Sequence, residues 1–145
     1  MAQNYQNLIV WQKAIELTVC IYTLTQAFPK SELYGLTSQM RRASISVASN
    51  IAEGRGTLNT AEFRQFVGIA QGSVFELRTQ ILVAKNLGFA AGEVLTQAEV
   101  LSNEVSRMLT TFIQRLALQS RNQVNRPACM RRTNELTANS QKLTA

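Results

Sequence analysis

Histidine and aspartate are both absent from this chain of 145 residues, and these absences exclude most catalytic designs. Without them there is no Ser-His-Asp triad, and the commonest general base and transition-metal ligand are missing. All nine acidic residues are Glu. Di-iron sites in helix bundles pair Glu with His in Glu-x-x-His motifs, so these glutamates do not supply one. We therefore expect no enzyme activity, no metal and no cofactor.

Cysteine and long apolar runs are also scarce. The two cysteines, Cys20 and Cys129, are fewer than the paired set that a secreted scaffold of this size usually carries. No apolar run approaches the roughly 20 residues that span a bilayer. The N-terminus lacks the basic and apolar regions of a secretory signal. We expect a cytoplasmic protein without membrane association.

Proline and glycine are few, and several of them mark the ends of helical segments. Pro29 ends the first segment, because proline can neither donate a hydrogen bond nor fit the next helical turn. Gly54-Arg55-Gly56 ends the second. No strand precedes these glycines and no Gly-Lys-Ser/Thr follows them, so a helix stop is favoured over a phosphate loop. Gly88 closes the third segment.

Four segments have apolar residues at intervals of three and four, which is typical of helices with one buried face. They predict helices over 8–28, 35–54, 60–87 and 93–117. The short connections make neighbouring helices antiparallel, so the predicted fold is all-α, an antiparallel up-down-up-down four-helix bundle. The expected buried positions are Val10, Ala14, Leu17, Ile21, Leu24, Phe28, Leu36, Met40, Ala43, Val47, Asn50, Phe63, Val67, Ala70, Val74, Leu77, Ile81, Ala84, Val94, Ala98, Leu101, Val105, Met108 and Phe112.

The charge divides the chain into two parts. The formal net charge is +6, and residues 1–117 contribute ten basic and eight acidic side chains to it. Residues 118–145 contribute five basic side chains and one acidic one, and they are rich in Asn, Gln, Ser and Thr. Such a segment buries too little apolar surface to offset its ordering entropy. We predict a bundle domain over 1–117 and a basic, disordered tail over 118–145.

Two helices carry more apolar residues than one core face needs. The surplus residues are Leu8, Trp11, Ile15 and Tyr22 in the first helix and Phe66, Ile69 and Phe75 in the third. They form either a wide core-facing arc or an interface between subunits. Gly68 and Gly72 each cost about 1 kcal/mol relative to Ala inside a helix. This cost indicates a close backbone approach, within the bundle or between subunits.

Some polar residues are best explained as structural. Asn50 falls where the pattern calls for an apolar residue, and a buried amide must be hydrogen-bonded. Ser46 and Ser73 are its expected partners, and such a network can fix register or oligomeric state. For Glu53 and Glu76 we expect ion pairs with basic residues. Their expected partners are Arg41, Arg42 and Arg78.

Several runs carry a family resemblance: LIVWQKA at 8–14, QMRRA at 39–43, SVASNIAEG at 46–54 and AQGSVFEL at 70–77. Over about residues 5–117 the chain resembles the four-helix bundle proteins first noticed as reading frames in intervening sequences of bacterial large-subunit ribosomal RNA. It is more distantly similar to accessory proteins of diversity-generating retroelements. The resemblance implies a barrel-shaped homopentamer with a basic surface that contacts nucleic acid. The tail after residue 118 lies outside it.

Basic residues gather toward one pole of the predicted bundle, where the first helix starts, the second ends, the third starts and the fourth ends. The nucleic-acid-binding candidates there and in the tail are Lys13, Arg55, Arg64, Arg115, Arg121, Arg126, Arg131 and Arg132. Possible additional basic contacts are Arg41, Arg42 and Arg78. The alternative is a solvated face whose positive field is weakened by Glu16, Glu53 and Glu62. No aromatic platform accompanies these residues in the sequence, so contact with backbone or shape is expected.

These observations predict a non-enzymatic, oligomeric nucleic-acid-binding protein. RNA is favoured over DNA as its partner, and the resemblance makes the oligomer a pentamer. The alternative is a ring-shaped accessory or assembly protein that docks a protein partner, such as the reverse transcriptase of a diversity-generating retroelement. Salt separates the two, because phosphate binding weakens steeply with salt and an apolar protein interface does not.

Overall fold

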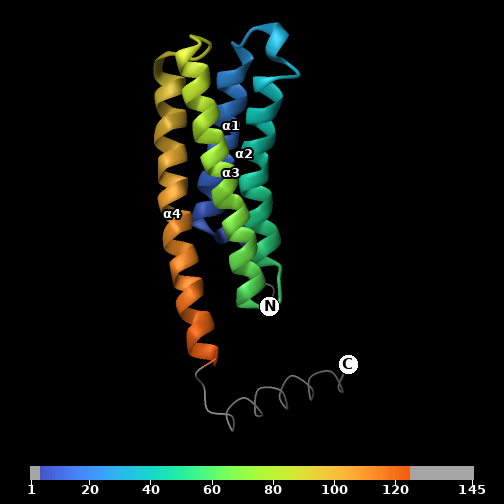
Figure 1. The fold of residues 1–145 in the computed structure, drawn as a ribbon, viewed down its shortest axis with the longest axis vertical. Helices are drawn as coiled ribbons and strands as arrows, with labels where there is room; N and C mark the ends of the chain where they lie inside the picture. Colours follow the sequence, from blue (N-terminus) through green and yellow to red (C-terminus); the bar gives the residue numbers. More distant parts are fainter. Residues whose placement is uncertain (1–3, 125–145) are drawn as a thin grey trace.

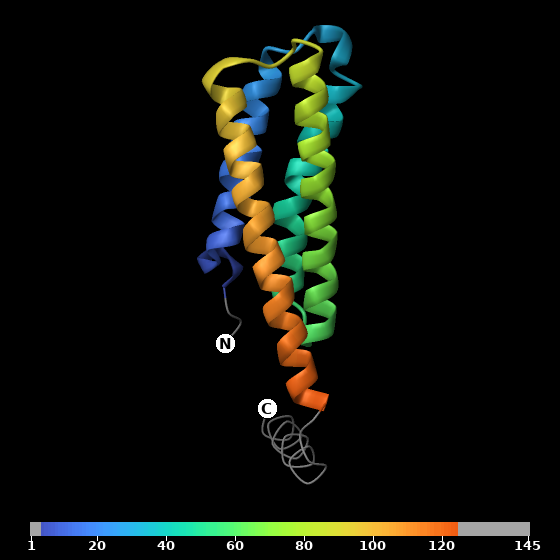
Figure 2. The ribbon, with the colours of Figure 1, turned by 60° about the vertical axis from the view of Figure 1, so that its left-hand side comes forward.

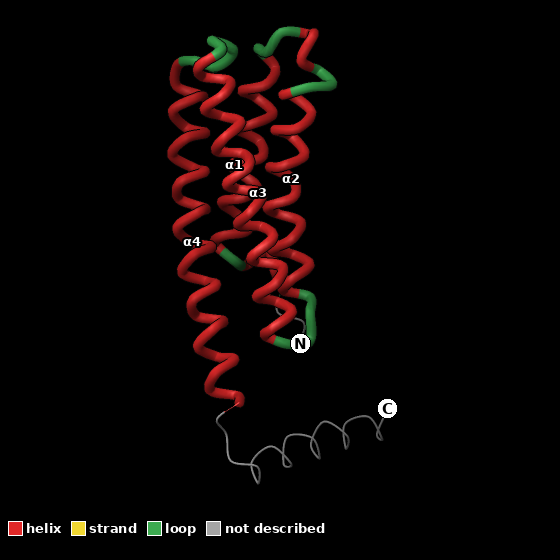
Figure 3. Tube along the Cα trace, in the orientation of Figure 1, coloured by secondary structure: helices red, strands yellow, loops and turns green. Residues whose placement is uncertain are grey.

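The chain folds into a bundle of four antiparallel helices, given by a computed structural model that describes residues 4–124 (Figure 1). The elements are η1 (Tyr5–Asn7), α1 (Ile9–Gln26), η2 (Lys30–Glu32), α2 (Leu36–Arg55), α3 (Thr60–Asn86) and α4 (Gly92–Val124). Residues 4–124 contain helices and connecting loops but no strand (Figure 3). The predicted all-α four-helix architecture is therefore confirmed.

Each helix packs against the next in the chain, and α4 packs against α1 and closes the bundle. The connections after α1 and α3 lie at one end, the upper pole (Figures 1 and 2). The connection between α2 and α3 and the start of α1 lie at the other end, the lower pole. The described chain has no helix of the length and apolar content that a bilayer crossing requires.

The core follows the predicted spacing closely. All six expected positions of α1 and its following loop are buried, and so are all seven of α3. On α2, Ile51 is buried where the pattern had placed Asn50, which is half-buried. On α4, Leu109 is fully buried, whereas Met108 and Phe112 pack at the margin. The exact helical period of 3.6 residues accounts for these one-residue shifts along longer helices.

The helix ends follow local signals in some places and not in others. Asn59 Oδ1 accepts a hydrogen bond from the Glu62 amide at 2.8 Å and so caps the N-terminus of α3. At the other end of α3, Gly88 has φ +74°, and the Phe89 amide donates to Ala84 O. Asn7 does not cap α1, because residues 5–7 form η1 and α1 starts at Ile9 without a side-chain cap.

The fourth helix is longer than predicted. It continues beyond residue 117 to Val124, because no Pro or Gly interrupts this stretch and Leu, Gln and Arg are good helix formers. Figure 2 shows this last segment extending past the lower ends of the other helices. The predicted tail thus begins inside a helix. Arg126, Arg131 and Arg132 lie outside the described residues.

The surplus apolar residues have two fates. Leu8 and Trp11 pack against the core and Phe66 is half-buried, whereas Ile15, Tyr22, Ile69 and Phe75 are exposed. A Cβ at Gly68 or Gly72 would meet nothing within 4 Å. The close backbone approach expected at these two glycines is therefore not made within the described subunit.

Candidate nucleic-acid interface

At the lower pole, Lys13 is engaged by acidic neighbours. Its Nζ lies 3.3 Å from Glu16 Oε2 on α1 and 3.9 Å from Glu104 Oε2 on α4. Partly exposed pairs of this kind add little stability, about 0–1 kcal/mol, but they cancel the charge locally. Lys13 therefore contributes less positive field to the pole than the sequence indicated.

Arg55 is held against the end of the bundle. Its guanidinium carbon lies 5.8 Å from the ring centroid of Phe63, within range of a cation–π contact. Its Nε is buried and has no hydrogen-bond partner among the described residues. The side chain is half-buried. Arg55 thus acts partly as a packing residue that covers Phe63.

Three other basic residues of the lower pole, Arg64, Arg115 and Arg121, are exposed. None of them forms an ion pair within residues 4–124. We refer to them as the pole arginines. Because they carry full charge into solvent without a counter-ion in the described chain, they form the strongest part of the predicted basic surface.

Two of the pole arginines, Arg64 and Arg115, lie on different faces of the bundle. Arg64 lies about two helical turns before Gln71, whose Nε2 donates to Thr110 Oγ1 on α4 at 3.0 Å. Arg64 therefore faces the α3–α4 side. Arg115 instead lines an apolar groove of about 470 Å³ with Leu8 and Ile9, on the α1–α4 side. The structure spreads these charges around the pole instead of gathering them in one patch.

The upper pole brings arginine and tyrosine together. Arg41 Nε donates to Thr25 Oγ1 at 2.9 Å, and its guanidinium lies 4.6 Å from the ring centroid of Tyr22 on α1. Arg42 is exposed, and Tyr34, just before α2, is 93% exposed. The two arginines and the two tyrosines line one hollow of about 530 Å³, completed by Leu33, Thr37, Ser38 and Ile45. We call it the upper-pole hollow.

No aromatic platform was expected beside the basic residues, but the arginines of the upper-pole hollow lie beside aromatic side chains. Tyr22 and Arg41 are 19 residues apart, and only the antiparallel pairing of α1 with α2 places them together. Tyr34 is close in sequence to Arg41 and Arg42, so the run from 34 to 42 held a usable signal. The turn before α2 and the first turns of that helix place Tyr34, Arg41 and Arg42 on the same side of the bundle, around one hollow.

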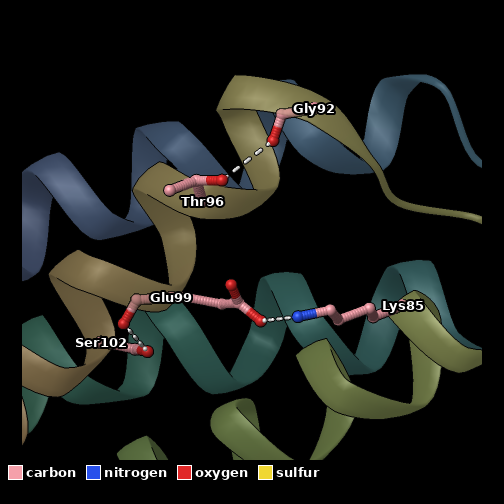
Figure 4. Close-up of polar contacts among 5 residues, drawn as sticks. All are labelled: Lys85, Gly92, Thr96, Glu99 and Ser102. Atoms are coloured by element: carbon pink, nitrogen blue, oxygen red, sulfur yellow. Dashed lines mark hydrogen bonds and ion pairs between the residues drawn. The ribbon is translucent and has the colours of Figure 1, made fainter.

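The remaining basic residues lie along α3 and α4. Lys85 pairs with Glu99 at 2.9 Å across these two helices (Figure 4). Arg78 is exposed nearby and lines a shallow groove with Phe75 and Glu99. Arg107, exposed on α4, was not among the predicted contacts.

The ion pairs expected for Glu53 and Glu76 are not among those of the described chain. Glu53 stands twelve residues after Arg41, about 18 Å along α2. Glu76 and Arg78 are two residues apart on α3 and so point in different directions. Glu76 instead accepts a hydrogen bond from Gln80 Nε2 at 3.1 Å.

The predicted polar residues of α2 and α3 form a chain of hydrogen bonds. Asn50 Nδ2 donates to Ser46 O at 2.8 Å and to Ser46 Oγ at 3.1 Å. The two hydroxyls of Ser46 and Ser73 are 2.9 Å apart, and Ser73 Oγ donates to Ile69 O. Each hydroxyl can therefore accept from one neighbour and donate to the next. This chain of hydrogen bonds fixes the register between α2 and α3.

Within residues 4–124, no group of three or more Cys and Glu side chains could hold a metal ion.

Comparisons with known proteins bear on the same residues. The family model of the 23S rRNA-intervening sequence protein matches residues 6–111. A solved protein of unknown function from Bacteroides thetaiotaomicron, of the S23 ribosomal protein family, has a similar fold. Its TM-score is 0.65 at 20% identity, over 72% of this chain and 98% of that one. No curated protein matches significantly. Because the family model covers most of the bundle, the chain belongs to the 23S rRNA-intervening sequence protein family.

Proposed function

We propose that this protein is a non-enzymatic homo-oligomer that contacts structured RNA through basic residues. The observation that carries the proposal is the set of pole arginines, which project from the bundle without ion-pair partners in the described chain. The family name, which refers to ribosomal RNA, favours RNA as the polyanion.

The chemistry of the pole suits phosphate contact. Arginine presents a planar fork of donors that matches a phosphate, and it stays charged at all relevant pH values. Because Arg64 and Arg115 lie on different faces, these side chains would follow a folded backbone more readily than read one base edge. Structured RNA, which proteins recognise largely by shape and backbone, fits this arrangement.

Oligomerisation would strengthen this binding by repeating each charge around an axis. Two faces remain available for contact with another subunit. On one side, Tyr5, Trp11 and Ile15 line an apolar groove of about 270 Å³ between α1 and α2. On α3, Gly68 and Gly72 present open backbone. A contact between two different patches is heterologous and can close into a ring. The pentameric number rests on the family resemblance alone.

A salt titration of RNA binding tests the proposal. The probe is a labelled RNA hairpin. One variant combines Arg64→Gln, Arg115→Gln and Arg121→Gln, and the other is truncated after Val124. Both variants should bind the hairpin more weakly and show a flatter slope of log affinity against log salt. Each phosphate contact that is lost means that fewer counterions are released on binding. Arg107→Gln, which changes an exposed arginine of α4 outside the predicted contacts, is the control. Parental slopes for both variants would overturn the role of the pole.

A second candidate function is docking of a protein partner, such as a reverse transcriptase. It is favoured by the groove between α1 and α4, where Ile9 is 63% exposed beside Met108 and Phe112. Apolar surface of this kind is typical of protein interfaces. Binding through this groove should be nearly independent of salt and should be lost on Ile9→Ser, whereas RNA binding should not change.

A further inference from the structure

The upper-pole hollow has the composition of a nucleotide-binding surface. Tyr34 is 93% exposed, and such a ring presents a broad apolar face to water. It lies in the connection between η2 and α2, a short turn that covers one corner of the upper pole (Figure 1). Nothing in the bundle core depends on this side chain, so core packing does not explain an aromatic residue there.

The floor of the hollow is rigid. The hydrogen bond of Arg41 to Thr25 and its contact with the Tyr22 ring hold the guanidinium in one place between α1 and α2. Thr25 is itself 3% exposed, so the anchor is buried. A guanidinium fixed in this way loses little conformational entropy when it binds an anion.

The charge of the hollow is positive. Arg42 is exposed on its rim and forms no ion pair within the described chain. The acidic residue of the adjacent turn, Glu32, is used locally, because its Oε2 accepts the Leu36 amide at 3.1 Å and caps α2. Two guanidinium groups therefore face the hollow without a carboxylate among its lining residues.

We propose that the upper-pole hollow binds an unpaired nucleotide of RNA. The base stacks on the Tyr34 ring, and Arg42, assisted by Arg41, binds the adjoining phosphate. Stacking between the Tyr34 ring and one base requires a base that is unpaired and free, so the ligand is a loop, a bulge or a single-stranded end and not a duplex. A second copy of the chain is disfavoured as occupant, because an apolar contact here would bury two guanidinium groups without counter-ions.

This inference rests on the proposed function, since it names the part of an RNA that this surface takes. The test compares two labelled probes, a single-stranded oligonucleotide of eight uridines and a blunt-ended duplex RNA, by fluorescence anisotropy. For the single strand, Tyr34→Ala should lose about 5- to 150-fold in affinity, the range found for one stacked base. Tyr34→Phe keeps the ring and should bind like the parent. Arg42→Gln should reduce the salt slope by about one phosphate contact.

The outcomes are distinct. If Tyr34→Ala and Arg42→Gln both bind the single strand like the parent, this site is overturned while RNA binding by the pole arginines stands. If the parent binds neither probe, the proposed function fails as well. If light scattering shows that Tyr34→Ala lowers the oligomer mass, the hollow is an interface between copies and the inference is wrong. Equal losses on both probes would also contradict a site for unpaired bases.

Discussion

The backbone of α2 at Gly54 lies directly against the ring of Phe63 on α3. A Cβ at position 54 would stand 2.7 Å from Phe63 Cδ2 and 2.8 Å from Phe66 Cβ, closer than atoms can pack. Phe63 in turn meets Phe112 on α4, with ring centroids 5.1 Å apart. Gly54 is therefore a packing residue inside α2, and its lack of a side chain lets α2 and α3 converge at the lower pole.

Gly54→Ala should destabilise the subunit by about 1–3 kcal/mol, the usual cost of overfilling a packed site. The cost arises because the new methyl group must displace Phe63 or the backbone of α3. Urea unfolding followed by circular dichroism measures it. The matched control is Gly56→Ala, two residues later, where a Cβ would meet only ordinary contacts at 3.4 Å or more. Equal stability of the two variants would show that α3 adjusts at no cost.

Gly68→Ala and Gly72→Ala should have the opposite effect on the isolated subunit. Both positions are helical and open, so Ala should stabilise each by about 0.4–1 kcal/mol. If these glycines face a second subunit, the same methyl groups should weaken assembly. Unfolding at low protein concentration and light scattering at high concentration separate the two effects. A more stable subunit with an unchanged oligomer mass would remove these glycines from the interface.

Ser46→Ala and Ser73→Ala should not be additive. Each removes one end of the contact between their hydroxyls at 2.9 Å and should cost about 0.5–1.5 kcal/mol. Ser46→Ala should cost more, since Asn50 Nδ2 also loses the hydroxyl oxygen that accepts its hydrogen bond. A double-mutant cycle measures the coupling between the two. Strict additivity would mean that the two hydroxyls do not interact in solution.

The stability of the fold should fall at alkaline pH through Cys20. Burial raises the pKa of its thiol above the ordinary value of 9.0, and the thiol faces Val94 O at 3.6 Å. The folded state therefore keeps this proton to higher pH than the unfolded state does. Its contribution is complete below pH 9.0 and is lost as the pH rises through the folded pKa.

Urea unfolding midpoints measured below and above pH 9.0 test whether the Cys20 thiol causes the loss of stability. Cys20→Ala, although less stable throughout, should show a shallower decline between about pH 8 and 10 than the parent. Because the tyrosines and lysines remain in both proteins, their titration cancels in the comparison. Parallel declines would assign the alkaline loss to those other groups.

The secondary structure and the buried core follow from local patterns in the sequence. Apolar residues at intervals of three and four give each helix one buried face. Leu17, Val47, Val74 and Val105 could therefore be assigned to the core without a structure. Short connections then left one topology. The caps at Asn59 and Gly88 were equally local, since each depends on residues within one turn.

The contacts on the surface, in contrast, depend on how the helices pack against one another. Whether Lys13 is free or engaged depends on Glu104, which lies on another helix, and the place of Gly54 depends on the Phe63 ring. Tyr22 contacts Arg41 because α1 and α2 run antiparallel and each helix is rotated so that these two side chains face each other. A helical period fixes which residues face inward, but side-chain contacts between helices depend on rotation and register, which the packing of the whole core sets.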